Sequence, residues 1–104
     1  MKRGDLRWYR FLSPDKKRPV LILHRDEILP YLSEITIAPL TTTSRGIPSE
    51  VYLSKLTDGV PQDCVVNLDH VQTVSKSKIG NLIATLNPLK MKEVAQALKF
   101  ALKL

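Results

Sequence analysis

Cysteine and histidine are scarce in this sequence of 104 residues, which contains one cysteine, Cys64, and two histidines, His24 and His70. A single cysteine excludes an internal disulfide and is typical of a protein in a reducing compartment. His24 and His70 lie far apart, and no carboxylates cluster at the spacing of metal ligands, so we expect no metal site and no cofactor. The four glycines are scattered, which excludes a phosphate-binding loop of the P-loop type.

Long hydrophobic runs and a leader segment are also lacking. No apolar run reaches about 18 residues, so no membrane span is expected. Residues 1–10 are charged throughout and contain no apolar segment with a cleavage site, which argues against secretion, so we expect a cytoplasmic protein. Of the 104 residues, 43% are hydrophobic and 25% charged, and we expect residues 1–104 to form a single folded domain.

Negative charge is in deficit, with 10 acidic against 16 basic side chains and a net charge of +6. The excess lies at the two ends of the chain. Residues 1–26 carry eight basic and three acidic side chains and residues 75–104 six and one, whereas residues 27–74 carry two and six. A surface made from both ends either binds a polyanion, first of all nucleic acid, or keeps a small barrel in solution, and composition leaves both interpretations open.

Short apolar and β-branched stretches separated by turn residues predict a series of strands. They lie at residues 6–12, 19–23, 34–40, 49–54, 64–68, 71–75 and 82–86. Residues 13–15, Ser-Pro-Asp, favour a turn after the first strand. The continuous apolar run 19–23 indicates a buried strand, and we expect Pro19 at its start, where a missing N–H is tolerated.

The end of the chain predicts an amphipathic helix. Asn87 is a good N-cap and Pro88 suits the first helical position. Apolar side chains then recur at helical spacing, at Met91, Val94, Ala95, Leu98, Ala101 and Leu102. A single helical turn is expected within residues 26–32, capped by Asp26 and limited by Pro30. The fold expected is mainly β with α: a small SH3-like open barrel of about five to seven strands with a C-terminal helix docked on it.

Cationic and hydroxyl side chains gather at three predicted strand ends. Lys16, Lys17 and Arg18 precede the buried strand, the segment 41–46 follows the third strand, and Asp69 and His70 lie between the fifth and sixth. Loops at strand ends can converge on one rim of a barrel, although the same residues also serve as ordinary turn residues. A pairing of Cys64 with His70 as nucleophile and base is less favoured, because Cys64 opens an apolar strand, where a buried, inert thiol is more common.

If these side chains converge, the chemistry they suit is phosphodiester transfer in RNA. The ribose 2′-hydroxyl is the nucleophile, so the protein must move protons and stabilise a charged pentacoordinate transition state. Cations and hydroxyl donors aimed at the developing charge can do so without a metal ion.

Five segments, taken in order, resemble the MazF/PemK toxins. They are RGDL at 3–6, RPVLIL at 18–23, APLT at 38–41, GIPSEV at 46–51 and DCVVNLD at 63–69. The resemblance extends from about residue 2 to about residue 103. It implies a CcdB/MazF-like toxin fold, a homodimer, and a metal-independent endoribonuclease that cuts single-stranded RNA to leave a 2′,3′-cyclic phosphate and a 5′-hydroxyl. The implied partner is a cognate MazE-like antitoxin whose acidic, disordered tail covers the RNA groove.

The resemblance also assigns catalytic roles. Arg18 falls on the family's catalytic arginine; because a guanidinium stays protonated at neutral pH, we favour an electrostatic role on the scissile phosphate over a role as base. Thr41 would donate its hydroxyl to phosphate oxygens. Asp69 falls on an acidic position that some members use in acid–base work, and Asp5 on an acidic position near the site in some members.

Further positions would contact RNA. They are Lys16, Lys17, Arg45, Ile47, Pro48, Ser49 and His70. The first loop, residues 13–17, is shorter than in many members. The short loop leaves the identity of the second proton-transfer group open, and the more open groove suits bulkier RNA such as a tRNA or rRNA loop. Of the aromatic residues on the first strand, Trp8, Tyr9 and Phe11, core packing is favoured over stacking on RNA bases.

Two other functions are alternatives to RNA cleavage. One is a toxin of the same fold that acts on DNA gyrase, as CcdB does, through its C-terminal residues; the corresponding tail here, residues 100–104, looks instead like helix packing. The other is a non-catalytic RNA-binding barrel, which would show salt-sensitive binding without cleavage.

Overall fold

All of the predicted strands are found in the computed structural model, which describes residues 1–11 and 16–104. The strands are β1 (Asp5–Arg10), β2 (Lys17–Ile22), β3 (Glu34–Thr41), β4 (Glu50–Leu53), β5 (Cys64–Asn67), β6 (Gln72–Ser75) and β7 (Ile79–Thr85). The helices are α1 (Pro88–Leu102) and three 3-10 turns, η1 (Leu29–Tyr31), η2 (Leu68–His70) and η3 (Lys76–Lys78). The turn predicted at residues 13–15 and the predicted strand end at Leu12 lie outside the described residues.

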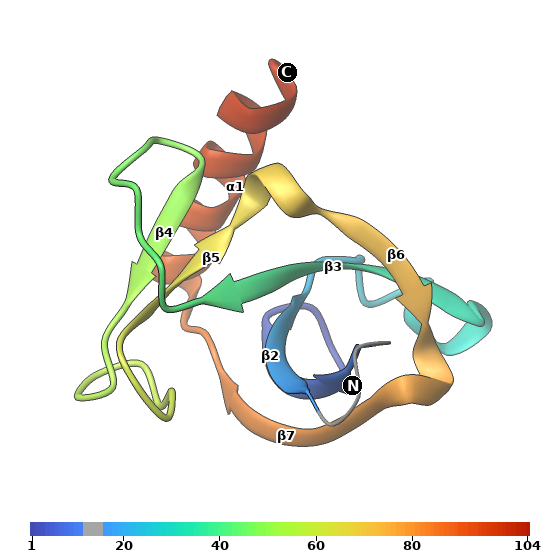
Figure 1. Ribbon diagram of the computed structural model, residues 1–104. Coiled ribbons are helices and arrows are strands. Elements are labelled where there is room, and N and C mark those ends of the chain that lie inside the picture. Colours follow the sequence, from blue (N-terminus) through green and yellow to red (C-terminus); the bar gives the residue numbers. More distant parts are fainter. Residues whose placement is uncertain (12–15) are drawn as a thin grey trace.

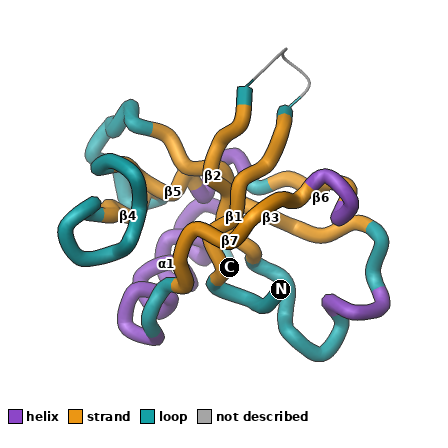
Figure 2. Tube along the Cα trace, turned by 90° about the horizontal axis from the view of Figure 1, so that it is seen from below, coloured by secondary structure: helices purple, strands orange, loops and turns teal. Residues whose placement is uncertain are grey.

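Strand β3 organises the sheet (Figure 1). One edge of β3 pairs with β2, whereas the other edge pairs with β6 over residues 34–37 and with β5 at Leu40 and Thr41. The strand order is β4-β5-β3-β2-β1-β7, with β6 beside β3 and every pair antiparallel. Because β3 changes partner along one edge, the sheet bends into the open barrel predicted from the sequence, and Figure 2 shows β1, β2 and β7 close together in the middle of the view.

Strand β2 explains the uninterrupted apolar run, because both of its faces are buried. Val20, Leu21 and Ile22 each have an exposed fraction of 0%. Val20 and Ile22 face a core inside the bent sheet, which also contains Ile37, while Leu21 faces a second core against α1. A strand covered on both sides reads as a continuous hydrophobic segment instead of an alternating one.

Helix α1 begins where the sequence predicts and covers β4 and η2 (Figure 1). The Asn87 side chain accepts a hydrogen bond from the Lys90 N–H at 2.8 Å, as expected of an N-cap. Val94 is completely buried in the second core. The last turn departs from the prediction, since Leu102 is exposed.

The end of the chain, residues 100–104, is likewise less packed than the sequence suggests. Phe100 and Leu104 are exposed as well as Leu102, so the expected packing of residues 100–104 is wrong for these three side chains.

Two local predictions are also wrong. Strand β2 begins at Lys17, so Pro19 lies inside the strand, opposite Trp8 of β1. Asp26 does not cap a helical turn: it accepts the Arg3 N–H at 2.7 Å, and η1 begins at Leu29 without a side-chain cap. Within residues 1–11 and 16–104, no helix is long and apolar enough to cross a membrane.

Candidate active site

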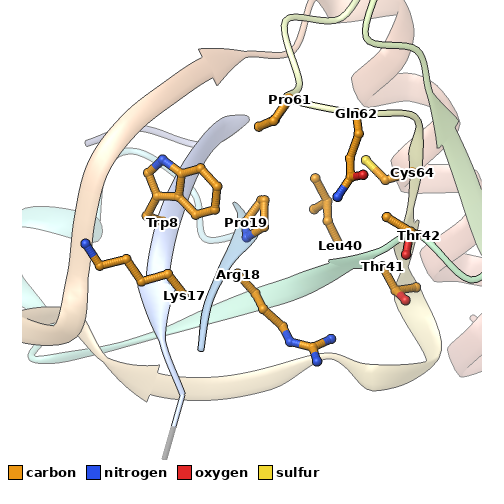
Figure 3. Close-up of a pocket in the computed structure, with 10 residues that line it drawn as sticks. All are labelled: Trp8, Lys17, Arg18, Pro19, Leu40, Thr41, Thr42, Pro61, Gln62 and Cys64. Atoms are coloured by element: carbon orange, nitrogen blue, oxygen red, sulfur yellow. The ribbon is translucent and has the colours of Figure 1, made fainter. Parts of the chain in front are cut away.

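Arg18 and Thr41 lie together on the wall between two adjoining cavities. The first, the central cavity, has a volume of about 360 Å³ and extends from Trp8 to Cys64 (Figure 3). The second, the loop cavity, has a volume of about 330 Å³ and extends to Arg45, Glu50, Asn67 and His70. Both cavities are lined by Arg18, Leu40 and Thr41.

The pairing of β2 with β3 brings these two side chains together. Val20 lies opposite Pro39 in this antiparallel ladder. Continuing the register by two residues places Arg18 opposite Thr41, and residues opposite each other share a face of the sheet. The sequence separates them by more than twenty positions, but strand pairing makes them neighbours.

The Arg18 guanidinium is available to a ligand. Arg18 is exposed, and Figure 3 shows its side chain extending toward Thr41 while Lys17 points the other way. Among the described residues, no carboxylate lies within ion-pair distance of Arg18. A planar guanidinium with free N–H donors matches two oxygens of a phosphate.

Thr41 is oriented by its own backbone. It lies at the end of β3, and its Oγ1 accepts the N–H of Thr43 at 3.2 Å. The hydroxyl proton is not used in that bond, so it can be donated to an anion in either cavity. Arg18 and Thr41 therefore provide a positive charge and a hydroxyl donor at one place.

The loop after β3 is held by the carboxylate of Glu50. This carboxylate accepts the N–H of Arg45 at 3.0 Å and of Gly46 at 3.1 Å, and lies 3.4 Å from the hydroxyl of Ser44. Gly46 has φ +65°, a conformation that a side chain disfavours. The arrangement fixes the loop that carries Arg45 along the loop cavity. Sequence reasoning gave Glu50 no role of its own; its signal was an acidic residue four positions after Gly46.

Asp69 and Ser49 contact each other and lie outside both cavities. The Ser49 hydroxyl donates to the Asp69 carboxylate at 2.5 Å, and Ser49 has an exposed fraction of 1%. The expectation that Ser49 borders an RNA path does not agree with this burial. Asp69 is exposed on η2 and is not part of the wall that holds Arg18 and Thr41.

The other predicted contact residues divide into two groups. Lys17 lines the central cavity and His70 the loop cavity, with the His70 Nδ1 3.3 Å from the Asn67 Nδ2. Lys16, Ile47 and Pro48 are exposed but line neither cavity. Sequence reasoning missed Gln62, which lines the central cavity from a loop without a recognisable motif.

The aromatic residues of β1 divide in the same way. Tyr9 is buried in the core, with its ring 4.7 Å from that of Phe11 in an edge-to-face contact. Trp8, the residue before Tyr9, instead lines the central cavity.

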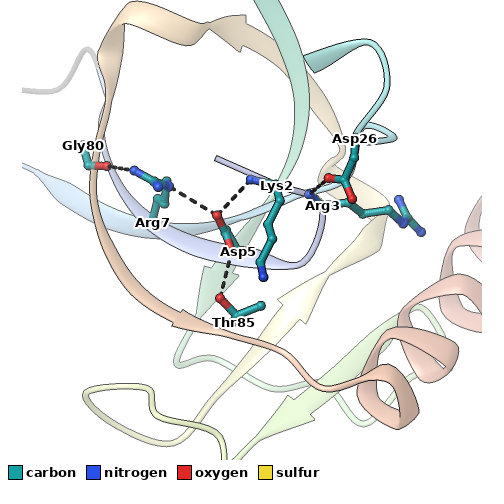
Figure 4. Close-up of polar contacts among 7 residues, drawn as sticks. All are labelled: Lys2, Arg3, Asp5, Arg7, Asp26, Gly80 and Thr85. Carbon is teal, nitrogen blue, oxygen red and sulfur yellow. Dashed lines mark hydrogen bonds and ion pairs between the residues drawn. The ribbon is translucent and has the colours of Figure 1, made fainter. Parts of the chain in front are cut away.

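Asp5 holds the N-terminus to β7, away from the two cavities (Figure 4). Its carboxylate, 3% exposed, accepts the N–H of Lys2 at 2.9 Å and the hydroxyl of Thr85 at 2.8 Å. The Arg7 Nε lies 3.7 Å away, and Arg7 also donates to the carbonyl of Gly80. These contacts give Asp5 a structural role and do not place it near Arg18.

Cys64 is an inert thiol. Burial, together with the carboxylates of Asp63 and Asp58, raises the pKa of Cys64 from 9.0 to about 11, so the thiol stays protonated at neutral pH. Cys64 lines the central cavity and His70 the loop cavity, so the two do not share a cavity. Over the described part of the chain, no three His, Cys, Asp or Glu side chains form a cluster that could hold a metal ion.

Comparison with known proteins identifies the family of this chain. Residues 2–102 match the family described as PemK-like, MazF-like toxin of type II toxin-antitoxin system, and the chain belongs to that family. The resemblance found in the sequence is thereby confirmed.

Individual relatives agree with this assignment. The "Probable endoribonuclease MazF2" of Mycobacterium tuberculosis is 36% identical over 99 residues, which are 95% of each chain. The solved structure of "Mycobacterium tuberculosis toxin MazF-mt6" has a TM-score of 0.87 and 35% identity, covering 96% of this chain and 97% of that one. An "Endoribonuclease in complex with its cognate antitoxin from Mycobacterial species" has a TM-score of 0.88 and 26% identity, covering 100% and 96%.

Proposed function

We propose that this protein is the toxin of a toxin–antitoxin pair and cleaves single-stranded RNA, in mRNA or in the loops of tRNA or rRNA. The observation that carries the proposal is the joint placement of Arg18 and Thr41 on the wall shared by the two cavities. The endoribonuclease names of its relatives support the reaction class.

In the proposed reaction the scissile phosphate lies against Arg18 and Thr41. The 2′-hydroxyl attacks the phosphorus and loses its proton, the bond to the 5′-oxygen breaks, and that oxygen gains a proton. The products are a 2′,3′-cyclic phosphate and a 5′-hydroxyl. Arg18 and Thr41 stabilise the charge on the non-bridging oxygens, which requires no metal ion.

Proton transfer needs a further group. Of the predicted candidates, His70 lines the loop cavity beside Arg18, and an imidazole can both accept and donate a proton. The Asp69 carboxylate accepts a hydrogen bond from the Ser49 hydroxyl. We propose that Asp69 affects the reaction indirectly, by positioning the segment that contains Ser49.

The proposed partner is a MazE-like antitoxin with an acidic, disordered tail. A solved relative is described as being in complex with its cognate antitoxin. The cationic side chains Lys17, Arg18 and Arg45 along the two cavities suit carboxylates as well as phosphates. We further propose that residues 1–104 act as one toxin domain, that the toxin is a homodimer whose two copies enclose the RNA groove, and that it acts in the cytoplasm.

The proposal is tested by RNA cleavage in the presence of EDTA. Wild-type protein is expected to cut single-stranded RNA and leave cyclic phosphate ends. Arg18→Ala is expected to lower the cleavage rate by about 10²–10³-fold, as loss of an oxyanion donor does, without affecting folding. Arg18→Lys keeps the charge but loses the fork, so its rate should lie between the two. Arg25→Ala, an exposed arginine outside both cavities, is the matched control. Undiminished cleavage by Arg18→Ala would contradict the assigned mechanism.

The exposed tail favours one alternative worth testing. Phe100, Leu102 and Leu104 are exposed, as expected of a toxin that acts on DNA gyrase through its C-terminus. Inhibition of gyrase supercoiling without RNA cleavage would establish that function in place of the first.

A further inference from the structure

We propose that bound RNA continues from the central cavity into a third, basic cavity, where a group of cations binds the phosphates of nucleotides next to the cleaved one. This inference rests on the proposed function and adds to it a second binding site. The third cavity, the β7 cavity, has a volume of about 330 Å³ and is lined by Trp8, Arg10, Lys17, Lys78 and Asn81, among others.

The β7 cavity adjoins the central cavity. Trp8 and Lys17 line both, just as Arg18 and Thr41 line both the central and the loop cavity. A ligand held by Arg18 therefore reaches the β7 cavity by passing Trp8 and Lys17.

Three cations from neighbouring elements line the β7 cavity: Arg10 of β1, Lys17 of β2 and Lys78 of η3. Arg10 of β1 is directly opposite Lys17 of β2. On the other edge of β1, Tyr9 pairs with Ile79, the first residue of β7, and Lys78 of η3 directly precedes Ile79. Adjacent strands are about 4.8 Å apart, so the side chains of Arg10 and Lys17 start close together, and Lys78 lines the same cavity.

Such a group of cations is unfavourable unless an anion binds to it. Like charges directly opposite each other across strands destabilise a sheet. Among the described residues, no carboxylate lies within ion-pair distance of Arg10, Lys17 or Lys78. An anionic ligand in the β7 cavity would relieve the repulsion among all three.

RNA fits this site better than an acidic polypeptide does. An RNA strand bound at Arg18 carries a negative charge at every nucleotide. Its successive phosphates can therefore pair with the cations that lie beyond Arg18. Trp8 lies on the same face of β1 as Arg10, two residues away, where its ring can stack against a base between the two phosphate sites.

The experiment measures RNA binding and the length dependence of cleavage. Binding is measured in the Arg18→Ala background, so that RNA is not cut, with single strands of about 4 and about 12 nucleotides over a range of salt concentrations. The test variant carries Arg10→Gln and Lys78→Gln, and Lys78→Arg tests rescue by charge. Lys92→Gln, an exposed lysine on α1 that lines none of the three cavities, is the control.

For the long RNA, the slope of log K against log salt should fall by about 0.7 for each phosphate contact that the test variant loses. The slope should be retained in Lys78→Arg and in the control. In the cleavage-competent protein, the advantage in kcat/KM of the long RNA over the short RNA should shrink in the test variant.

An unchanged slope, or an effect on the binding of polyglutamate but not of RNA, would overturn the inference. The proposed function has a separate readout, because it fails if wild-type protein does not cut RNA. In that case a lowered slope in the test variant would still establish the β7 cavity as an RNA site.

Discussion

Replacing Asp69 with alanine is expected to destabilise the protein through its contact with Ser49. The buried Ser49 hydroxyl donates to the Asp69 carboxylate at 2.5 Å, and the backbone around it is tied to η2, since the Ser49 carbonyl accepts the Leu68 N–H at 2.9 Å. Asp69→Ala leaves this hydroxyl without its partner in a place that water does not reach. Hydrogen bonds to charged groups contribute about 1.5–3 kcal/mol, and we expect about 1.5 because the Asp69 carboxylate is exposed.

The reverse substitution should cost less. Ser49→Ala removes the buried polar group itself, and water can still solvate the exposed Asp69, so a loss of about 0.5–1 kcal/mol is expected. In the Ser49→Ala background, Asp69→Ala should then change stability by less than about 0.5 kcal/mol. The double-mutant cycle therefore predicts a coupling energy of about 1 kcal/mol.

Urea unfolding of the four proteins measures the coupling, and RNA cleavage separates the two roles of Asp69. If Asp69 acts by positioning, Ser49→Ala should slow cleavage about as much as Asp69→Ala does. If Asp69 itself moves a proton, only Asp69→Ala should slow it. Additive effects on stability would refute the structural reasoning, and a slow Asp69→Ala beside a fast Ser49→Ala would return Asp69 to the catalytic set.

Three further predictions concern the fold. Leu21→Ala, at a side chain with an exposed fraction of 0%, should lower the free energy of unfolding by about 2–5 kcal/mol, whereas Leu56→Ala, at 86%, should change it by less than about 0.5 kcal/mol in the same urea titration. Asn87→Ala should lower the free energy of unfolding by about 1 kcal/mol, because the N–H of Lys90 loses the side chain that caps it, whereas Asn87→Asp should keep the cap and the stability. Cys64 should resist a thiol reagent at neutral pH until the protein unfolds. Since burial raises the pKa of Cys64, the unfolded chain ionises first as pH rises above 9.0, so the wild type should lose more stability toward pH 11 than Cys64→Ala does.

Local features of the fold could be predicted from the sequence because neighbouring residues determine them. The Asn87 cap needs only the N–H of Lys90, three positions away, and a buried strand at 20–22 follows from three apolar residues in succession. Local rules failed where distant residues compete. Asp26 has the side chain of a helix N-cap, but its carboxylate instead accepts a hydrogen bond from the backbone N–H of Arg3, which is far away in the sequence.

The site could be predicted only in part. The resemblance pointed to Arg18 and Thr41, and the structure shows that both line the same two cavities. It could not show that Ser49 is buried against Asp69, because burial depends on how η2 packs beside β4. The role of Glu50 could not be predicted either, because its hydrogen-bond donors are backbone N–H groups, which every residue other than proline has.

The sequence by itself determined which segments are strands, where the last helix starts, and that the ends of the chain carry its positive charge. The tertiary structure decided which of those charges act together. The pairing of β2 with β3 places Arg18 opposite Thr41, and the pairing of β1 with β2 places Arg10 opposite Lys17; such a register is set by the burial of whole strand faces. A count of lysines and arginines cannot contain that information, because it depends on pairs of residues that only the folded sheet brings together.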